Sequence, residues 1–178
     1  MKKNYKKKNE EMSLENMFLQ AYDNYSAKIS RHIFFRVDGK ETAEDLTSET
    51  FFKTWQYLRE GKKIKNIAGF LYQVANNLII DHYRNKSKKP ISLNEIAEPI
   101  DNSRRSNEDM ADIKIDFALV KKHLDLLPDI YSRIIIYRFI DGLSVAEIKE
   151  LTGKSIVNVY VIIHRAIKIL RKNINEKN

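Results

Sequence analysis

The stretch Ser144-Val-Ala-Glu-Ile-Lys-Glu-Leu-Thr-Gly-Lys-Ser-Ile-Val-Asn-Val159 decides how the last third of the chain folds. Ser144 and Glu147 have the spacing of a capping box, in which each side chain satisfies a free backbone N–H group of the other. Gly153 follows where a short helix must end, and Ser155 can cap a second helix that runs to about residue 173. This pattern predicts a helix-turn-helix, whose second helix fits the major groove of DNA. The alternative is a helical hairpin that serves only as core.

The composition of the whole chain is that of a folded, basic protein. Its 178 residues suffice for one ordinary domain or two small ones, and 43% of them are hydrophobic. The net charge of +8 favours a polyanionic partner, although a basic protein without such a partner would have the same charge. The absence of cysteine excludes disulfides, thiolate catalysis and cysteine zinc sites. No apolar run reaches the about 18 residues of a membrane span, and no secretory signal is visible, so we expect a cytoplasmic protein.

Helix-type periodicity runs through nearly the whole chain, and no stretch alternates like a β-strand. A basic polar tail over residues 1–12 precedes an expected helix that begins near residue 13 and ends before Asp38-Gly39. Two further helices are expected over about 42–60 and about 66–86, each with an apolar stripe. Packed together, these helices would form one small domain over residues 13–89.

The composition changes after Pro90. Residues 91–116 carry seven acidic and three basic side chains, a net charge of −4 inside a basic protein. We interpret residues 90–111 as a flexible acidic linker. Helical periodicity resumes near residue 112, Pro128 is expected in the first turn of a new helix, and the helix-turn-helix completes a second domain over 112–178. The predicted fold is therefore all-α, with two small helical domains joined by the linker.

Two helix faces carry residue types that suit binding. The helix expected over residues 66–86 ends in a basic run that follows Tyr72 and Asn77. Aromatic rings beside basic side chains suit nucleic acid whose nucleobases have left the duplex. A solvated helix end whose lysines interact with the helix dipole is the alternative. The helix expected over residues 42–60 has an acidic and aromatic face that can bind a partner helix, although a core helix with a solvated back is the more common explanation.

No arrangement of residues typical of an enzyme or a metal site is visible. The histidines His32, His82, His123 and His164 lie far apart and lack metal-ligand spacing. No glycine-rich phosphate loop or nucleophile motif occurs, and the linker acids lack the spacing of a calcium loop. We expect no catalysis, no metal and no cofactor.

Four segments together resemble region 2 of the extracytoplasmic-function (ECF) sigma factors, small two-domain members of the bacterial sigma-70 family. They are Phe18-Leu-Gln-Ala-Tyr-Asp-Asn-Tyr25, Ala43-Glu-Asp-Leu-Thr-Ser-Glu-Thr-Phe-Phe-Lys-Thr-Trp55, Phe70-Leu-Tyr-Gln-Val-Ala-Asn-Asn77 and Asp81-His-Tyr-Arg84. Leu126-Leu-Pro128 and Gly142-Leu-Ser-Val-Ala-Glu-Ile-Lys149, continued through Gly153, Val159 and Arg165-Ala166, are similar to region 4. The resemblance covers roughly residues 14–89 and 120–172.

The resemblance implies a promoter-specificity subunit of RNA polymerase. In the family, the acidic and aromatic helix of region 2 binds the clamp helices of the largest polymerase subunit, and the matching positions here are Asp45, Leu46, Glu49, Phe52 and Gln56. The following helix and its preceding loop melt the −10 element by capturing flipped bases, whose edges are hidden in duplex. The matching positions are Asn66, Phe70, Tyr72, Asn77, Arg84, Lys86, Lys88 and Lys89.

For region 4, the resemblance implies that the second helix enters the major groove of the −35 element and that the domain rests on the flap of the second-largest subunit. The expected DNA contacts are Lys154, Ser155, Asn158, Tyr160, His164 and Arg165. Many members of the family are also held by an anti-sigma factor, which the resemblance allows as a further partner. No small-molecule substrate is expected.

The recognition helix departs from the family pattern. Family members usually carry Thr-Val-Lys-x-Arg where this chain has Asn158-Val-Tyr-Val-Ile162. Val159 fits as the core anchor, but Tyr160 and Ile162 replace two bases. The apolar side chains here either meet thymine methyl groups or face a protein. They are Ile156, Val157 and Tyr160. Upstream, Gln73 and Asn76 stand where the family often has Arg.

Two other functions remain open at this point. A stand-alone helix-turn-helix regulator with an unrelated helical N-terminal domain would bind duplex DNA without polymerase. A sigma-like interaction protein would bind polymerase after losing promoter reading, which the altered recognition helix keeps possible.

Overall fold

The computed structural model describes residues 2–88 and 117–175, with side chains described over 14–86 and 117–175. The expected acidic linker over residues 90–111 and Lys89 lie outside the described residues, as does the side chain of Lys88. Within the described ranges every regular element is a helix and no strand occurs, which confirms the all-α prediction. None of these helices is both long and apolar enough to cross a membrane.

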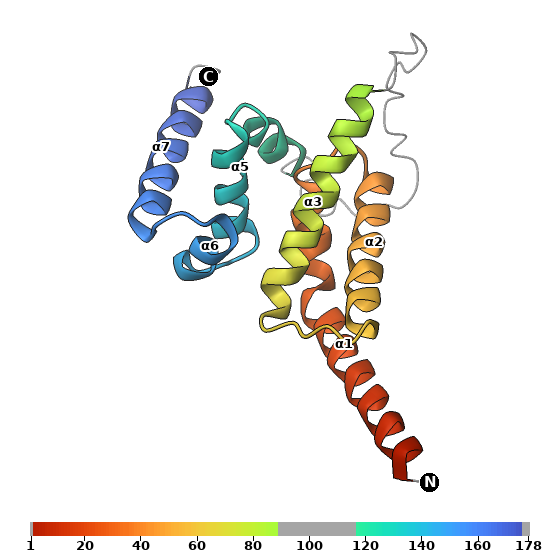
Figure 1. The fold of residues 1–178 in the computed structure, drawn as a ribbon. Coiled ribbons are helices and arrows are strands. Elements are labelled where there is room, and N and C mark those ends of the chain that lie inside the picture. The colour runs from red at the N-terminus through yellow and green to blue at the C-terminus, as the bar shows by residue number, and fades with distance from the viewer. Residues whose placement is uncertain (1, 89–116, 176–178) are drawn as a thin grey trace, which may run out of the picture.

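The first unit is a bundle of three helices, α1 (Lys2–Phe34), α2 (Lys40–Arg59) and α3 (Ile67–Lys88), each in contact with the other two (Figure 1). The expected start near residue 13 is wrong, because α1 already begins at Lys2 and includes the expected polar tail. No glycine or proline precedes Gly39, so nothing in the sequence interrupts this helix. Gly39 itself ends the turn before α2 with a φ of 88°, a conformation that costs glycine little.

The second unit contains helical residues 117–124, then α5 (Asp129–Ile135), the π-helical turn η1 (Ile136–Ile140), α6 (Val145–Thr152) and α7 (Ile156–Asn175). Pro128 caps α5 instead of occupying its first turn. Its ψ of 141° is extended, and its carbonyl accepts from the N–H groups of Tyr131 and Ser132. A proline at this position gives up a donor that the helix start would leave unpaired.

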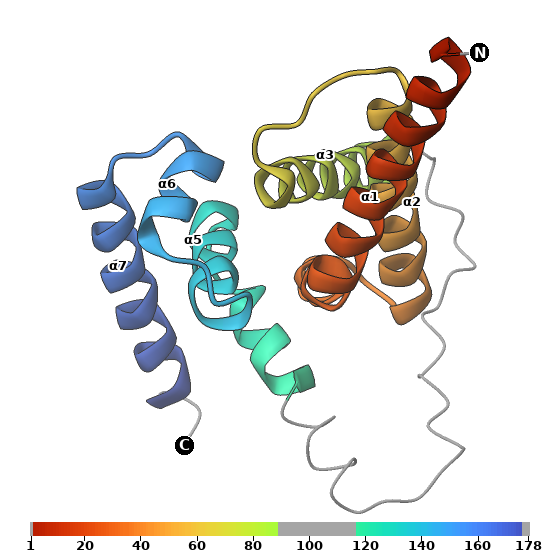
Figure 2. The same ribbon diagram turned by 90° about the horizontal axis from the view of Figure 1, so that it is seen from below.

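The two units pack against each other (Figure 2), whereas the sequence predicts two separate small domains. One buried cluster runs from Ile29, Leu71 and Ala75 of the first unit to Ile148 and Val159 of the second. A second cluster gathers side chains of the second unit around Phe35, which follows α1 and is only 2% exposed. The sequence could not predict this packing, because the apolar stripe of each helix could equally be buried against the other helices of its own unit.

Candidate functional site

The helix-turn-helix has the local geometry that its sequence predicts. The Glu147 N–H donates to Ser144 Oγ at 3.3 Å, and the Ser144 N–H donates to Glu147 Oε2 at 2.8 Å. The Ser144 hydroxyl also donates to Glu147 Oε2 at 2.6 Å, and this bond together with the one from the Ser144 N–H lowers the pKa of the Glu147 carboxyl below its ordinary value. Gly153 ends α6 with a φ of 67°, and Ser155 Oγ accepts from the Asn158 N–H at 3.2 Å. The predicted capping box, glycine turn and serine cap are confirmed.

Helix α7 has one buried face and one exposed face. Val159, Ile162 and Ala166 are buried, so the prediction that Val159 is a core anchor is confirmed. Ile162 lies on the same buried face and is 6% exposed. Of the two positions where the family usually has basic residues, 160 and 162, only Tyr160 therefore faces solvent. The predicted −35 residues other than the half-buried Lys154 are exposed. They are Ser155, Asn158, Tyr160, His164 and Arg165.

The predicted polymerase face of α2 lies beside an apolar groove. Asp45, Glu49 and Gln56 are exposed, and Phe52 is 57% exposed. Leu46 is buried in the core, so its side chain cannot contact a partner in this conformation. The groove lies between α1 and α2. Among the described residues it is lined by Phe18, Leu19, Tyr22, Phe51, Phe52 and Trp55, with Glu15 of α1 as its one charged side chain. Sequence reasoning missed the contribution of α1 to this site, because the groove exists only where two helices meet.

On α3, part of the predicted −10 set shares one face. Phe70, Asn77 and Arg84 are spaced by seven residues, which places them along one stripe of the helix. Phe70 packs on the ring of Tyr57, with centroids 4.7 Å apart, and Asn66 Oδ1 accepts from the Gly69 N–H at the start of the helix. The stripe therefore begins at a well-anchored loop.

Of the residues predicted for the −10 element, Tyr72 is buried, and both Arg84 on the stripe and Lys86 form ion pairs. Tyr72 is only 1% exposed, which removes it from any DNA contact in this conformation, and burial raises the pKa of its hydroxyl. Arg84 forms an ion pair with Asp81 at 2.8 Å, and Lys86 Nζ lies 3.8 Å from a carboxylate oxygen of Asp38. These two pairs are exposed, so they cost little to exchange for phosphate.

A buried polar cluster joins the two units, and sequence reasoning missed it. His32 Nδ1 lies 2.9 Å from Asp141 Oδ2, and both side chains have 0% exposure. The imidazole stacks on the Tyr137 ring with an interplanar angle of 1° and meets the Tyr72 ring edge-on. The histidine spacing gave no hint of this contact, because its partner comes from a different unit.

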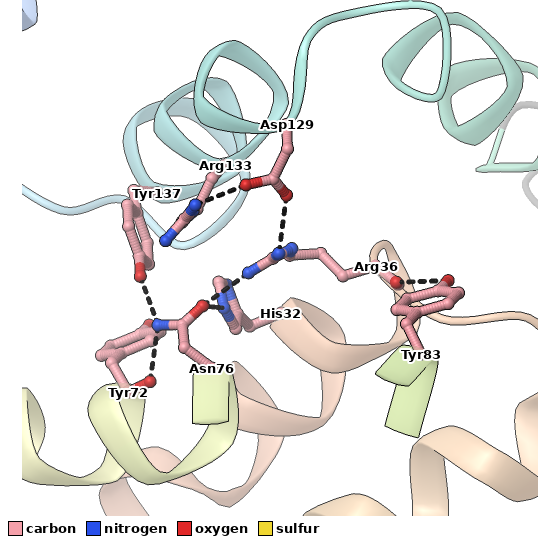
Figure 3. Close-up of polar contacts among 8 residues, drawn as sticks. All are labelled: His32, Arg36, Tyr72, Asn76, Tyr83, Asp129, Arg133 and Tyr137. Atoms are coloured by element: carbon pink, nitrogen blue, oxygen red, sulfur yellow. Dashed lines mark hydrogen bonds and ion pairs between the residues drawn. The ribbon is translucent and has the colours of Figure 1, made fainter. Parts of the chain in front are cut away.

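Asn76 lies at the centre of this cluster (Figure 3). Its Nδ2 donates to Tyr137 Oη and to the Tyr72 carbonyl, both at 2.6 Å, and its Oδ1 accepts from Arg36. Arg36 also pairs with Asp129 at 2.9 Å. At this position, where the family often has Arg, the shorter amide of Asn76 bridges the two units.

The start of α3 also meets the second unit. A pocket there is lined from the first unit by Asn66, Phe70 and Gln73, and from α6 by Glu150 and Leu151. Lys63 and Lys65 also line this pocket, so the loop expected to capture a −10 base meets one carboxylate and two ammonium groups there. Among the described residues, no group of His, Asp and Glu side chains could hold a metal ion.

Two family models match the chain. "Sigma-70 region 2" covers residues 21–89, and "Sigma-70, region 4" covers residues 119–170. The ECF RNA polymerase sigma factor BldN of Streptomyces coelicolor is 29% identical over 160 residues, which are 87% of this chain and 59% of BldN. The RNA polymerase sigma factor YlaC of Bacillus subtilis is 29% identical over 167 residues, 92% of this chain and 93% of YlaC.

One solved structure supports the fold. The sigma factor RpoE of Bartonella quintana, in complex with the anti-sigma factor NepR, superposes with a TM-score of 0.63 at 17% identity. The match covers 89% of this chain and 96% of RpoE. At this identity the similarity is one of fold.

Proposed function

Since the chain belongs to the extracytoplasmic-function group of the sigma-70 family, we propose that its two units act together as a promoter-specificity subunit of RNA polymerase. The observation that carries this proposal is the presence, in one chain, of a region 2 match followed by a region 4 match with a complete helix-turn-helix. A stand-alone regulator would not need a region 2 unit, so that alternative is not favoured. Sigma factors are initiation factors, and the reaction itself belongs to polymerase.

Polymerase binding is assigned to α2 and its groove. Phe52 offers an exposed aromatic anchor beside an apolar groove, and the carboxylates of Asp45 and Glu49 lie on the same face of the helix. An aromatic anchor beside an apolar groove, with polar residues at its rim, is typical of a protein interface. The partner that fits is a helix with basic side chains, as expected for the clamp helices of the largest subunit.

Promoter reading is divided between the units. We assign the −10 element to the α3 stripe of Phe70, Asn77 and Arg84 with Asn66 in the preceding loop, because an aromatic ring and exposed polar groups suit unstacked bases. The −35 element is assigned to the exposed face of α7, and contact of region 4 with the polymerase flap remains a prediction from the family resemblance. Tyr72 is left out of the −10 set because it is buried.

An anti-sigma factor is the further partner we propose. The similar RpoE structure holds the anti-sigma factor NepR, and the exposed apolar groove between α1 and α2 is the surface that we propose for such a partner. Because polymerase and the genome share the bacterial cytoplasm, we propose that compartment for this chain.

Run-off transcription tests the function directly. Purified core polymerase is supplied with a pool of genomic fragments, with and without this protein, and the transcript starts are sequenced. We expect initiation at a defined set of sites only when both proteins are present. Duplex binding that does not require polymerase would support the stand-alone regulator, and polymerase binding without initiation would support the interaction protein.

A double substitution tests the polymerase face. Asp45→Ala combined with Phe52→Ala removes the acidic and aromatic anchors, and we expect core affinity to fall by at least about tenfold with the fold intact. The matched control is Leu126→Ala, which removes an apolar side chain of similar exposure from the second unit. Unchanged affinity of the double variant would refute the assignment.

A further inference from the structure

The first two turns of α7 expose several apolar side chains. Ile156, Val157, Tyr160 and Val161 are 46%, 72%, 59% and 37% exposed. Their spacing places them on one side of the helix, opposite the buried Val159. Apolar side chains grouped on a surface and surrounded by polar residues mark an interaction site.

The charge of the same helix selects the kind of partner. From Gly153 to Asn175 the sequence contains no acidic residue. The basic residues of this stretch are Lys154, Arg165, Lys168, Arg171 and Lys172. The exposed face therefore has apolar side chains at the start of the helix and positive charge along the remainder. A polyanion that also presents an apolar group complements this arrangement, because its phosphates pair with the basic side chains.

Duplex DNA offers one apolar group to a helix in its major groove. This group is the 5-methyl of thymine, since every other base edge presents hydrogen-bond donors or acceptors. The second helix of a helix-turn-helix points its N-terminal residues at the base edges. The apolar turns of α7 are thus in the position where base reading takes place, with Ser155 and Asn158 beside them for polar contacts.

We propose that Ile156, Val157 and Tyr160 read thymine methyl groups, so that the upstream promoter element of this protein is recognised in part by van der Waals contact with thymines. The inference rests on the proposed function, in which α7 enters the −35 element. It goes further by naming the chemical group that is read and the side chains that read it. Tyr160 stands where the family usually has a basic residue. The contact of a basic side chain with phosphate or guanine is then replaced by contact of the Tyr160 ring with a thymine methyl group.

Replacing thymine by deoxyuridine isolates this interaction, because it removes the methyl group and leaves base pairing unchanged. The reconstituted holoenzyme first selects duplexes from a promoter library in which only the upstream element is randomised. Each thymine of the selected element is then replaced by deoxyuridine, one at a time, and affinity is measured. We expect at least two positions at which affinity falls by about fourfold, the effect of removing one buried methyl group.

Protein variants identify the side chains involved. With Val157→Ala, affinity for the thymine duplex should fall. The variant should then bind the thymine and deoxyuridine duplexes equally well, because the side chain that contacts the methyl group is no longer present. Ile174→Ala is the matched control, since Ile174 lies on the same helix and is 46% exposed, as Ile156 is. This control should keep the full sensitivity to deoxyuridine.

Three results would overturn the inference. If the selected upstream element binds equally well with deoxyuridine throughout, α7 reads DNA without the methyl groups, and the proposed function stands. If Val157→Ala and Tyr160→Ala spare duplex binding but weaken assembly with core polymerase, the apolar face binds protein. If no upstream sequence is selected although transcription starts at defined sites, the −35 assignment of α7 fails together with the inference.

Discussion

Helices α3 and α7 are both proposed to read DNA, but the structure presents them differently. The DNA-facing side of α7 is exposed, and no acidic residue occurs along the helix. The corresponding part of α3 starts at a pocket shared with Glu150 and ends in an Arg84–Asp81 ion pair. In this arrangement the face of α7 proposed for the −35 element is exposed, whereas the start of the α3 face proposed for the −10 element borders the second unit.

The contact between the units contains buried polar groups as well as apolar side chains. It contains the buried pair of His32 and Asp141, and two buried oxygens within it, Asp141 Oδ1 and Tyr72 Oη, have no hydrogen-bond partner in the structure. A buried polar group without a partner costs about 1–3 kcal/mol. The contact between the units therefore combines buried polar groups with the apolar cluster that joins the units.

The largest effect is expected from Phe35→Ala. This change removes a buried ring that packs in the core of the second unit, and such truncations cost about 3–5 kcal/mol. The packed arrangement should then open. Because the chain has no cysteine, Glu44→Cys and Lys168→Cys provide two specific dye positions for energy transfer between the units.

The matched control for Phe35→Ala is Phe139→Ala, since Phe139 is an aromatic residue with 60% exposure. Energy transfer should fall for the Phe35 variant and stay unchanged for the control. If both variants give the same transfer as the parent, Phe35 does not hold the units together.

A smaller effect is expected from Asp141→Ala, which leaves the His32 ring without its buried partner. The cost of such a change is about 1–3 kcal/mol, again against the packed arrangement. Glu60→Ala is the comparison, because its ion pair with Lys62 joins two exposed side chains and is worth at most about 1 kcal/mol. Equal loss of energy transfer in both variants would contradict the importance of the buried pair.

Ser144→Ala should affect the helix-turn-helix while leaving α3 unchanged. Loss of a serine cap costs about 1 kcal/mol in the free energy of unfolding. The pKa of Glu147 is lowered in the folded state, so its contribution is present above the unfolded pKa and is lost as pH falls through the folded pKa. The difference in urea midpoint between parent and variant should therefore shrink in acid; a constant difference would exclude the capping box as its cause.

The smallest effect is expected from Glu150→Gln at the pocket of α3. Removing one carboxylate beside Asn66 and Phe70 should raise affinity for a single-stranded −10 oligonucleotide by about two- to threefold, the effect of one exposed charge. Glu44→Gln removes an exposed carboxylate of α2 and serves as the control. Equal affinity of both variants would indicate that α6 does not obstruct the −10 reader.

Several features of the fold could be predicted because they depend on residues only a few positions apart. Ser144 with Glu147 and the positive φ of Gly153 set the start and end of α6, and apolar spacing identified Val159 as a core residue. The start of α1 was predicted wrongly, because a polar composition was interpreted as a tail although no residue there breaks a helix. Local patterns thus gave the helices and most of their ends.

Tertiary structure decided which predicted site residues are accessible and what lies between the units. Leu46 and Tyr72 carry the residue types of a binding site, yet packing buries both, and the same is true of Ile162 on α7. The contact of His32 with Asp141 joins residues 109 positions apart, and no local pattern encodes such a pairing. The sequence by itself determined the helices, the helix-turn-helix and the charge that favours DNA, because these follow from short-range spacing and composition. Only the packing of two units could place Asn76 between them and leave the apolar turns of α7 exposed, since burial depends on the whole fold.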